Sequence, residues 1–486
     1  MSIRLGSRVE HREYGRGVVR ELLGGQAVVE FYGERIQVAA EDLSSLDDDG
    51  PAPVPSNVTL EIGRIMFRRA IEAINLGVVP PHPDQLLSLA INGAQHLRKM
   101  ETWLRNAKKQ GFCKVFFGDY GSGKSHQLRT LEALARKHGW VVSYVEFDPK
   151  EADPAKPHLV YRAIVSGLRF PPRDDGSTVS GVEGFIREVR DHWSQASQGT
   201  TFRSSPWFWN AFSLLRNFPH SDDLEYRNAC AWLGGQPIPL SDVKRLALRT
   251  GRRTEVPPRM PRTLETSDIY VFHLVVLNEL CQLLGYKGLL LILDEAEHVR
   301  GFSTKRRDRA NNLFEMLSRC SHPPVPDDSP PVRNDHGYIL PAFWTTGPHF
   351  GLAVGLTEGD TFSDPDLPIR EACAFLHAED DAEFLKPPEP AHYKEWLGRF
   401  LELVHAHFHS AELLNNHANR KLLADALASE FTRVSPRERV MRLWVKLGCL
   451  VPSIILAGAA TEVEDVRSLA AKAAREVAGR MLPWEE

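Results

Sequence analysis

Hydrophobic and polar residues alternate in short runs along residues 1–46, and turns that contain glycine separate the runs. The runs are RVEH, VVREL, AVVEFY, RIQVA and EDL. Alternation of this kind, with a tight turn after each run, predicts five short antiparallel strands. We expect them to form a small β-barrel with a core made of Val9, Val18, Val28, Val29, Phe31, Ile36 and Val38.

A linker and a helix follow the predicted barrel. Residues 44–57, SSLDDDGPAPVPSN, are acidic and rich in proline, which is a composition typical of linkers. Over residues 61–76 the hydrophobic positions recur at helical spacing. We therefore place the barrel at residues 1–46, the linker at 47–57 and the start of a second unit, which opens with an amphipathic helix, at residue 58.

The second unit has the pattern of an α/β fold with a parallel sheet. Residues 112–148 give a strand, a glycine loop, a helix and a strand, which together form a βαβ unit. The apolar runs Gly288–Leu293 and Gly351–Leu356 have the character of central strands covered on both faces. Residues 393–482 carry amphipathic patterns and almost no strand signal. The sequence thus predicts an α/β core with an insertion over residues 58–380 and a helical lid domain over 381–486.

Composition and charge narrow the class of protein. The chain of 486 residues has no apolar run near the roughly 18 residues that a spanning helix needs, and its first residues lack a signal-peptide pattern. We expect a cytoplasmic protein that does not contact a membrane. Six cysteines without a CxxC pair favour reduced thiols. A net charge of -4 gives no attraction of the whole protein to nucleic acid, so DNA binding would need a local basic patch.

The clearest chemical motif follows the first predicted strand of the α/β core. Residues 118–125, GDYGSGKS, match the P-loop pattern, and a helix with one apolar face comes next. Backbone N–H groups of such a loop and the helix N-terminus surround phosphates. Lys124 is expected to hold the β and γ phosphates of ATP, and the Ser125 hydroxyl to join the Mg²⁺ shell. A glycine turn before a helix is the purely structural alternative. The loop residues expected to bind ATP are Gly118, Asp119, Tyr120, Gly121, Ser122, Gly123, Lys124 and Ser125.

A second motif, Leu291-Ile292-Leu293-Asp294-Glu295, places two acids at the end of a buried strand. Asp294 is expected to hold Mg²⁺ through water, and Glu295 to orient or deprotonate the attacking water. The alternative is that these acids only cap the next helix. Thr357, after the third apolar run, is either a polar sensor of the γ-phosphate or an ordinary turn residue.

Two basic segments lie outside these motifs. One contains Lys244, Arg245, Arg249, Arg252, Arg253, Arg259 and Arg262 with the single acid Glu255, and it would either bind a DNA backbone or form a solvated loop. The other follows the acid pair and contains Arg300, Lys305, Arg306, Arg307 and Arg309. In a ring-forming ATPase an arginine of the second segment would reach the nucleotide of a neighbouring subunit. The aromatic run Trp207-Phe208-Trp209 is expected in the core, with base stacking as the alternative.

Several longer segments resemble one family. GDYGSGKSHQLRTLE, GWVVSYVEFDPKEADPAKPHLVYRAIVSGLRFP, WLGGQPIP, GYKGLLLILDEAEHV and SPRERVMRL together look like the AAA-type ATP-binding protein BrxD of BREX phage-defence systems. The resemblance implies an ATPase of a defence operon that works beside a DNA helicase and other subunits. It also implies nucleotide contacts from Gly118 through Ser125 and from Asp294 and Glu295. Arg437 resembles the sensor arginine in the lid of such ATPases, and a helix start opened by Pro436 is the alternative.

The N-terminal barrel is similar to a different protein class. RVEHREYGRGVVRELLGGQAVVEFYGERIQVAAEDL resembles the small SH3/Tudor-like barrel at the C-terminus of UvrD/PcrA helicases, which implies a role in docking.

From the motifs and the two resemblances together, we expect an Mg-ATP-hydrolysing AAA-type ATPase, a homo-oligomer that acts in antiviral defence on or near DNA. Two alternatives stay open, an ATP-bound regulatory switch with little turnover and a helicase-loading factor.

Overall fold

The computed structural model describes most residues within the ranges 7–45, 57–118, 122–173, 179–216, 224–261, 266–323, 339–357, 382–385, 389–407, 412–433 and 444–450. Within these ranges it leaves out residues 12–13, 24, 32–33, 77–78, 81–90, 92 and 250. It also describes residues 465, 468, 471 and 472. The chain forms two compact units. One consists of Met1–Thr102, Gly121–Ala133 and Leu385–Glu486, and the other of Trp103–Tyr120 and Leu134–Phe384. Across the described residues, no helix has the length and apolar character needed to cross a membrane.

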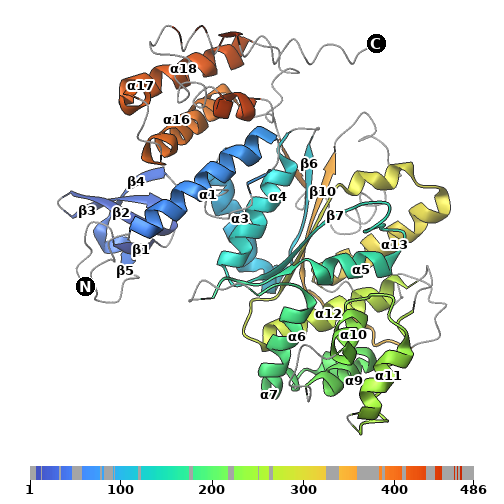
Figure 1. The fold of residues 1–486 in the computed structure, drawn as a ribbon. Coiled ribbons are helices and arrows are strands. Elements are labelled where there is room, and N and C mark those ends of the chain that lie inside the picture. The colour runs from blue at the N-terminus through green and yellow to red at the C-terminus, as the bar shows by residue number, and fades with distance from the viewer. Residues whose placement is uncertain are drawn as a thin grey trace. The chain divides into compact units, whose positions relative to one another are not determined.

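The first unit begins with a five-stranded antiparallel sheet in the order β4-β3-β2-β1-β5 (Figure 1). Its strands are β1 (Arg8–His11), β2 (Gly15–Leu23), β3 (Gln26–Phe31), β4 (Glu34–Ala39) and β5 (Leu43–Ser45), with the 3-10 turn η1 (Ala40–Asp42) before the last. The five predicted strands are therefore present. Closure of this sheet into an SH3/Tudor-like barrel stays a prediction.

The core face of this sheet differs in part from the predicted one. Val19 and Ala27 are fully buried, whereas Val18 and Val28 beside them are only partly buried. Side chains alternate between the two faces of a strand, so an error of one position exchanges the core and solvent faces. A bulge between Val19 and Glu21 shifts the register of β2 against β3, and the hydrophobic pattern alone does not place it. The buried set is Val9, Val19, Ala27, Val29, Val38 and Leu43.

Most of the other described residues of the first unit are helical. Its helices include α1 (Asn57–Leu76), α16 (Pro390–His407), α17 (Glu412–Asn415), α18 (His417–Arg433) and the first parts of α3 (Gly93–Gln110) and α4 (Lys124–Lys137). The predicted amphipathic helix is confirmed, because α1 buries Phe67 and Ile74 against α16 residues such as Phe400. The helical character of the C-terminal segment is likewise confirmed over its described residues, and its role as a lid stays a prediction.

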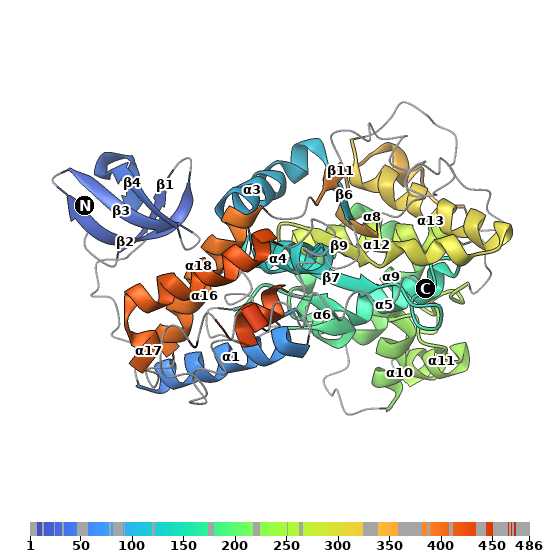
Figure 2. The ribbon, with the colours of Figure 1, turned by 90° about the horizontal axis from the view of Figure 1, so that it is seen from above.

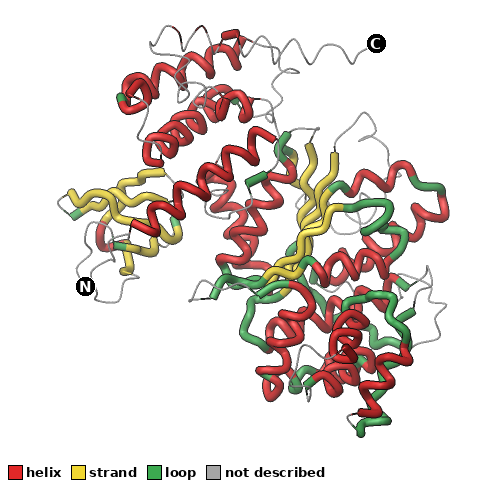
Figure 3. The backbone as a smooth tube through the Cα atoms, viewed as in Figure 1, coloured by secondary structure: helices red, strands yellow, loops and turns green. Residues whose placement is uncertain are grey.

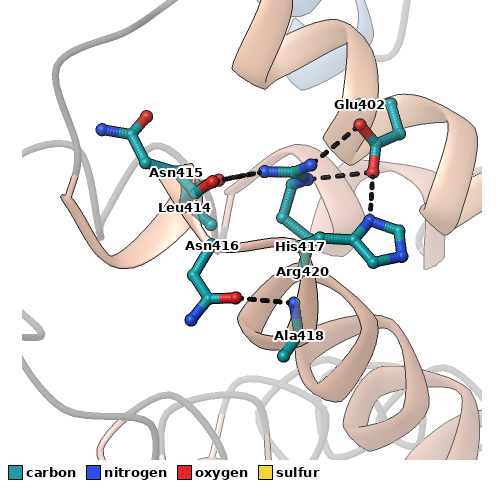
Figure 4. A network of polar contacts seen from close by, with 7 residues as sticks. All are labelled: Glu402, Leu414, Asn415, Asn416, His417, Ala418 and Arg420. Carbon is teal, nitrogen blue, oxygen red and sulfur yellow. Dashed lines mark hydrogen bonds and ion pairs between the residues drawn. The ribbon is translucent and has the colours of Figure 1, made fainter.

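A buried arginine joins the three C-terminal helices (Figure 4). The guanidinium of Arg420 donates to both carboxylate oxygens of Glu402 at 3.0 Å and to the carbonyl oxygens of Leu414 and Asn415 at 2.7 and 3.1 Å. His417 adds a contact of 3.1 Å to the same carboxylate. Partial burial acts to raise the pKa of Glu402, but the hydrogen bonds from Arg420 and His417 outweigh it and the pKa is lowered. The Arg420 side chain of α18 therefore contacts both α16 and α17.

The second unit contains a six-stranded sheet in the order β11-β6-β10-β9-β7-β8. Figures 1 and 2 each label some of its strands, and Figure 3 draws strands in yellow. Its strands are β6 (Cys113–Gly118), β7 (Val141–Glu146), β8 (Leu168–Arg169), β9 (Leu289–Asp294), β10 (Gly351–Thr357) and β11 (Ala382–Phe384). All neighbours pair in parallel except β7 and β8 at one edge. Every residue of β9 is buried, as expected for a strand covered on both faces. The predicted α/β fold with a parallel sheet is therefore confirmed.

Between β7 and β10, the described residues outside β8 and β9 are mainly helical. The helices are α5 (Pro157–Ser166), α6 (Gly181–Asp191), α7 (Trp193–Ala196), α8 (Thr200–Ser204), α9 (Pro206–Leu215), α10 (Leu224–Leu233), α11 (Leu240–Arg249), α12 (Ser267–Leu283), η2 (Ala296–Gly301), α13 (Thr304–Ser321) and η3 (Phe343–Thr345). Trp207 and Phe208 of α9 are fully buried, so the predicted core role of this aromatic run is confirmed. Glu279 of α12 accepts the backbone N–H groups of Thr201 and Phe202 and so caps the start of α8.

Candidate functional site

The P-loop segment begins at the end of β6 and leads into α4. Gly118 is the last residue of β6, and α4 starts at Lys124. Gly123 has a φ of 100°, a left-handed conformation that favours glycine, and its carbonyl accepts the N–H of Gln127 at 2.9 Å. Among the described residues, no heavy atom lies within 4 Å of the position that a Cβ would take at Gly123. The backbone here thus has the turn and the open space that a phosphate needs. Asp119, Tyr120 and Gly121 lie outside the described residues.

Polar side chains around this turn are buried. Lys124 is only 9% exposed, and the Ser122 hydroxyl is a buried oxygen without a hydrogen-bond partner in the described part of the chain. Burial lowers the pKa of His126 to about 4, so that this imidazole is neutral at neutral pH. A lysine, a free hydroxyl and the first N–H groups of a helix are donors suited to an anion. The residues present therefore fit a bound phosphate.

The acid pair lies at the carboxyl end of β9 in the second unit. Asp294 is 2% exposed, and both of its oxygens accept hydrogen bonds. The hydroxyl of Tyr144 donates to Oδ2 at 2.5 Å, and the backbone N–H of Glu295 donates to Oδ1 at 2.9 Å. A carboxylate has about four lone-pair positions, so two remain for other ligands. Asp294 is consequently a buried, oriented carboxylate with remaining capacity to bind water or a cation.

Glu295 has a different environment from Asp294. Of the non-glycine residues that the structure describes, it alone has a positive φ, at 61° with ψ at 31°. Its side chain is 46% exposed, and Oε2 lies 3.9 Å from Nε2 of His298. Left-handed backbone is costly for a residue with a Cβ, and such positions cluster at functional sites. The turn thus separates the two acids into a buried carboxylate and one that solvent reaches.

Thr357 ends β10, the strand between β6 and β9. In the register of the sheet it pairs with Gly118, so the ends of three neighbouring parallel strands meet at one edge. The Thr357 hydroxyl donates to Oε1 of Glu297, whose other oxygen is buried without a partner among the described residues. Ligands of open parallel sheets bind outside the carboxyl ends of the strands. The predicted residues Gly118, Asp294 and Thr357 therefore share the edge where a ligand is expected.

The oxygen donors at this edge also suit magnesium. Mg²⁺ commonly takes one or two carboxylates together with substrate phosphates, and it does not need a cage made only of protein. Within the described residues no group of three or more His, Cys, Asp or Glu side chains forms such a cage. The Asp294 carboxylate is an oxygen ligand of the type that Mg²⁺ takes.

The basic segments are more strongly paired than their sequence suggests. In the first, Arg252 contacts Glu255 at 2.8 Å, Arg249 contacts Glu225 at 2.8 Å and Arg245 contacts Asp242. Because Glu225 comes from α10, the ion pair of Arg249 depends on helix packing and is not visible in the local sequence. Arg253 and Arg259 remain exposed.

In the second basic segment, Arg306 contacts the fully buried Asp153 at 3.1 Å and stacks over Phe302. This arginine therefore stabilises its own subunit, which makes it a poor choice for reaching a neighbour.

Two residues at the site were not predicted from the sequence. Tyr144 and Glu297 contact Asp294 and Thr357, respectively. The only local signal for Tyr144 is a polar hydroxyl within the apolar run VVSYVEF. Arg437, the predicted lid arginine, lies outside the described residues.

A parallel sheet with a glycine loop and a helix after β6 is consistent with a P-loop nucleotide-binding domain. The family model described as "BREX system ATP-binding protein BrxC/D" matches residues 64–206 of this chain. The predicted resemblance to BrxD-like ATP-binding proteins is thereby confirmed, and the matched segment includes the entire P-loop. No curated protein and no solved structure matches the chain.

Proposed function

We propose that this protein is an AAA-type ATPase that hydrolyses Mg-ATP in a BREX-like antiviral defence system. The buried carboxylate of Asp294 at the end of a central parallel strand carries this proposal. It is the second motif that a hydrolytic P-loop protein needs, and the P-loop itself lies in the segment that the BREX ATP-binding family matches.

The binding roles follow from the chemistry of the loop. Backbone N–H groups of residues 118–125 surround the phosphates, and Lys124 holds the β and γ phosphates as a positive charge. The hydroxyl of Ser125 and the carboxylate of Asp294 would hold Mg²⁺. When bound, the ion neutralises charge on the β and γ phosphate oxygens.

The hydrolytic role belongs to Glu295. Its side chain is half-exposed, so water can reach it, and the positive φ fixes the direction in which it leaves the strand. Glu295 would orient the attacking water and accept its proton. Thr357 is the proposed sensor of the γ-phosphate, and Arg437 is the proposed arginine of the lid.

The proposed partners come from the family. A BREX ATPase would act beside a DNA helicase or another defence protein, and a homo-oligomer would allow an arginine to reach a neighbouring nucleotide. Among the described residues of the first basic segment, the exposed arginines Arg253 and Arg259 are proposed for DNA contact.

A regulatory switch or a helicase-loading factor with little turnover is the second candidate. One observation favours it: the single proton of the Thr357 hydroxyl is directed at Glu297. The Thr357 hydroxyl would have to break its hydrogen bond to Glu297 before it could donate to the γ-phosphate.

Replacement of Lys124 by alanine tests nucleotide binding. The variant loses a charge-assisted contact worth roughly 1.5–3 kcal/mol, so ATP affinity should fall about 10- to 100-fold and turnover should be lost. Binding of a fluorescent ATP analogue measures this. Lys137→Ala, at the other end of α4, is the matched control and should bind like the parent. Normal ATP binding by Lys124→Ala would show that the P-loop assignment is wrong.

A further inference from the structure

Tyr144 and Asp294 come from neighbouring strands that are far apart in the sequence. In the parallel register of β7 and β9, Tyr144 lies opposite Ile292 and Glu146 lies opposite Asp294. Residues two positions apart in a strand point to the same face, so Tyr144 and Asp294 are diagonal neighbours on one face. Diagonal neighbours lie about 7–8 Å apart, a separation that a long aromatic side chain spans. The sheet register therefore brings the phenol to the carboxylate.

The contact is a short hydrogen bond to a buried carboxyl group. The hydroxyl of Tyr144 donates to Oδ2 of Asp294 at 2.5 Å, and Asp294 is 2% exposed. Hydrogen bonds from a hydroxyl to an ionised oxygen are short and about twice as strong as neutral ones. With the Glu295 N–H on Oδ1, both oxygens are fixed, and the plane of the carboxylate cannot rotate freely.

We propose that Tyr144 is a positioning residue for magnesium binding, acting through Asp294. This inference rests on the proposed function, because it assumes that Asp294 is a ligand of the ATP-bound metal. The phenol occupies one lone-pair direction of Oδ2 and so sets which directions remain for the ion or its water. Outer contacts of this kind fix the geometry of a metal ligand, and their loss typically lowers metal affinity.

The test compares Tyr144→Phe with the parent protein as full chains. Phenylalanine keeps the ring and removes only the donor. Mn²⁺ replaces Mg²⁺ as the probe, and its affinity is measured by electron paramagnetic resonance with a non-hydrolysable ATP analogue bound. Tyr144→Phe should bind Mn²⁺ about 10- to 100-fold more weakly than the parent. Affinity for the nucleotide in the presence of EDTA should stay within about twofold, because Tyr144 acts on the metal ligand alone.

A matched control separates positioning from stability. Tyr286 donates to Oε2 of Glu188 at 3.3 Å in the same unit, before the start of β9. Tyr286→Phe therefore loses a comparable contact between a tyrosine and a carboxylate, yet it should bind Mn²⁺ like the parent. In an Asp294→Asn background, Tyr144→Phe should have no further effect on Mn²⁺ affinity, since the residue through which it acts is altered.

The outcomes distinguish the inference from the proposed function. If the parent with bound nucleotide takes up no Mn²⁺, the proposed function is wrong and the inference falls with it. If the parent binds Mn²⁺ and Tyr144→Phe binds it within twofold of the parent, only the positioning role is overturned. Equal weakening in Tyr286→Phe would also overturn it, because the effect would then reflect general stability.

Discussion

At the scale of single residues, the carboxyl edge of the parallel sheet gives each acid a different environment. Asp294 is buried and accepts two hydrogen bonds, Glu295 is half-exposed in a left-handed turn, and Glu297 is tied to Thr357. These differences suit the proposed roles of Asp294 in binding a cation and of Glu295 in contacting water, whereas Glu297 contacts the end of β10. The sequence DEAE alone does not assign them.

Thr357→Val tests the proposed sensor. Valine keeps the shape and removes the hydroxyl that donates to Oε1 of Glu297. Hydrolysis should slow about tenfold, the equivalent of one hydrogen bond of roughly 1.4 kcal/mol in the transition state, while ATP affinity changes little. Phosphate release measures the hydrolysis rate, and titration with nucleotide measures the ATP affinity. Glu297→Gln is the control, because an amide oxygen still accepts from Thr357. Unchanged hydrolysis in Thr357→Val would limit this residue to a structural role.

The contacts of these residues explain what the sequence could and could not predict. The P-loop and the acid pair were predictable because each is a continuous motif beside an apolar strand. The bond from Tyr144 to Asp294 joins residues 150 positions apart, and it exists because β9 lies next to β7 in the sheet. No local pattern specifies that order. The same holds for Glu297 and Thr357, which are 60 positions apart on η2 and β10.

At the scale of secondary-structure elements, strands β1–β5 have a core of their own. The buried residues of this sheet form a cluster separate from the one that α1 shares with α16 and α18. One contact from the sheet to a helix is the guanidinium of Arg98 in α3, 5.3 Å from the ring centroid of Tyr14. Such a cation–π contact contributes about 0.5–1 kcal/mol at an exposed site. The sheet is therefore suited to act as a separate docking module.

Deletion of residues 1–50 tests this docking role. ATP hydrolysis should stay within about twofold of the parent, because the sheet holds none of the proposed site residues and has a hydrophobic cluster of its own. Phage defence in cells and capture of a partner protein should be lost. Arg98→Ala is the control that removes only the contact to Tyr14, and it should retain defence. A truncated chain that still defends would contradict docking, and one that precipitates would make the sheet part of the core fold.

At the scale of the whole molecule, the two units carry different parts of the proposed chemistry. The start of α4, with Lys124 and Ser125, belongs to one unit, and the strand ends with Asp294 and Thr357 belong to the other. Both compact units draw on segments from distant parts of the chain, so the linear domain boundaries at residues 58–380 and 381–486 stay a prediction. The proposed site residues are therefore distributed over both units.

The measurement that tests ATP hydrolysis most directly is single-turnover cleavage of ATP by the parent and by Glu295→Gln with Mg²⁺ present. Glutamine keeps the shape of Glu295 and removes the base, so hydrolysis should fall about 100- to 10,000-fold while ATP stays bound. Glu151→Gln, an exposed acid in the turn after β7, should cleave ATP like the parent. Trapped, uncleaved ATP in Glu295→Gln alone is the predicted result. Equal cleavage by Glu295→Gln and the parent, or no cleavage by the parent, would contradict the account.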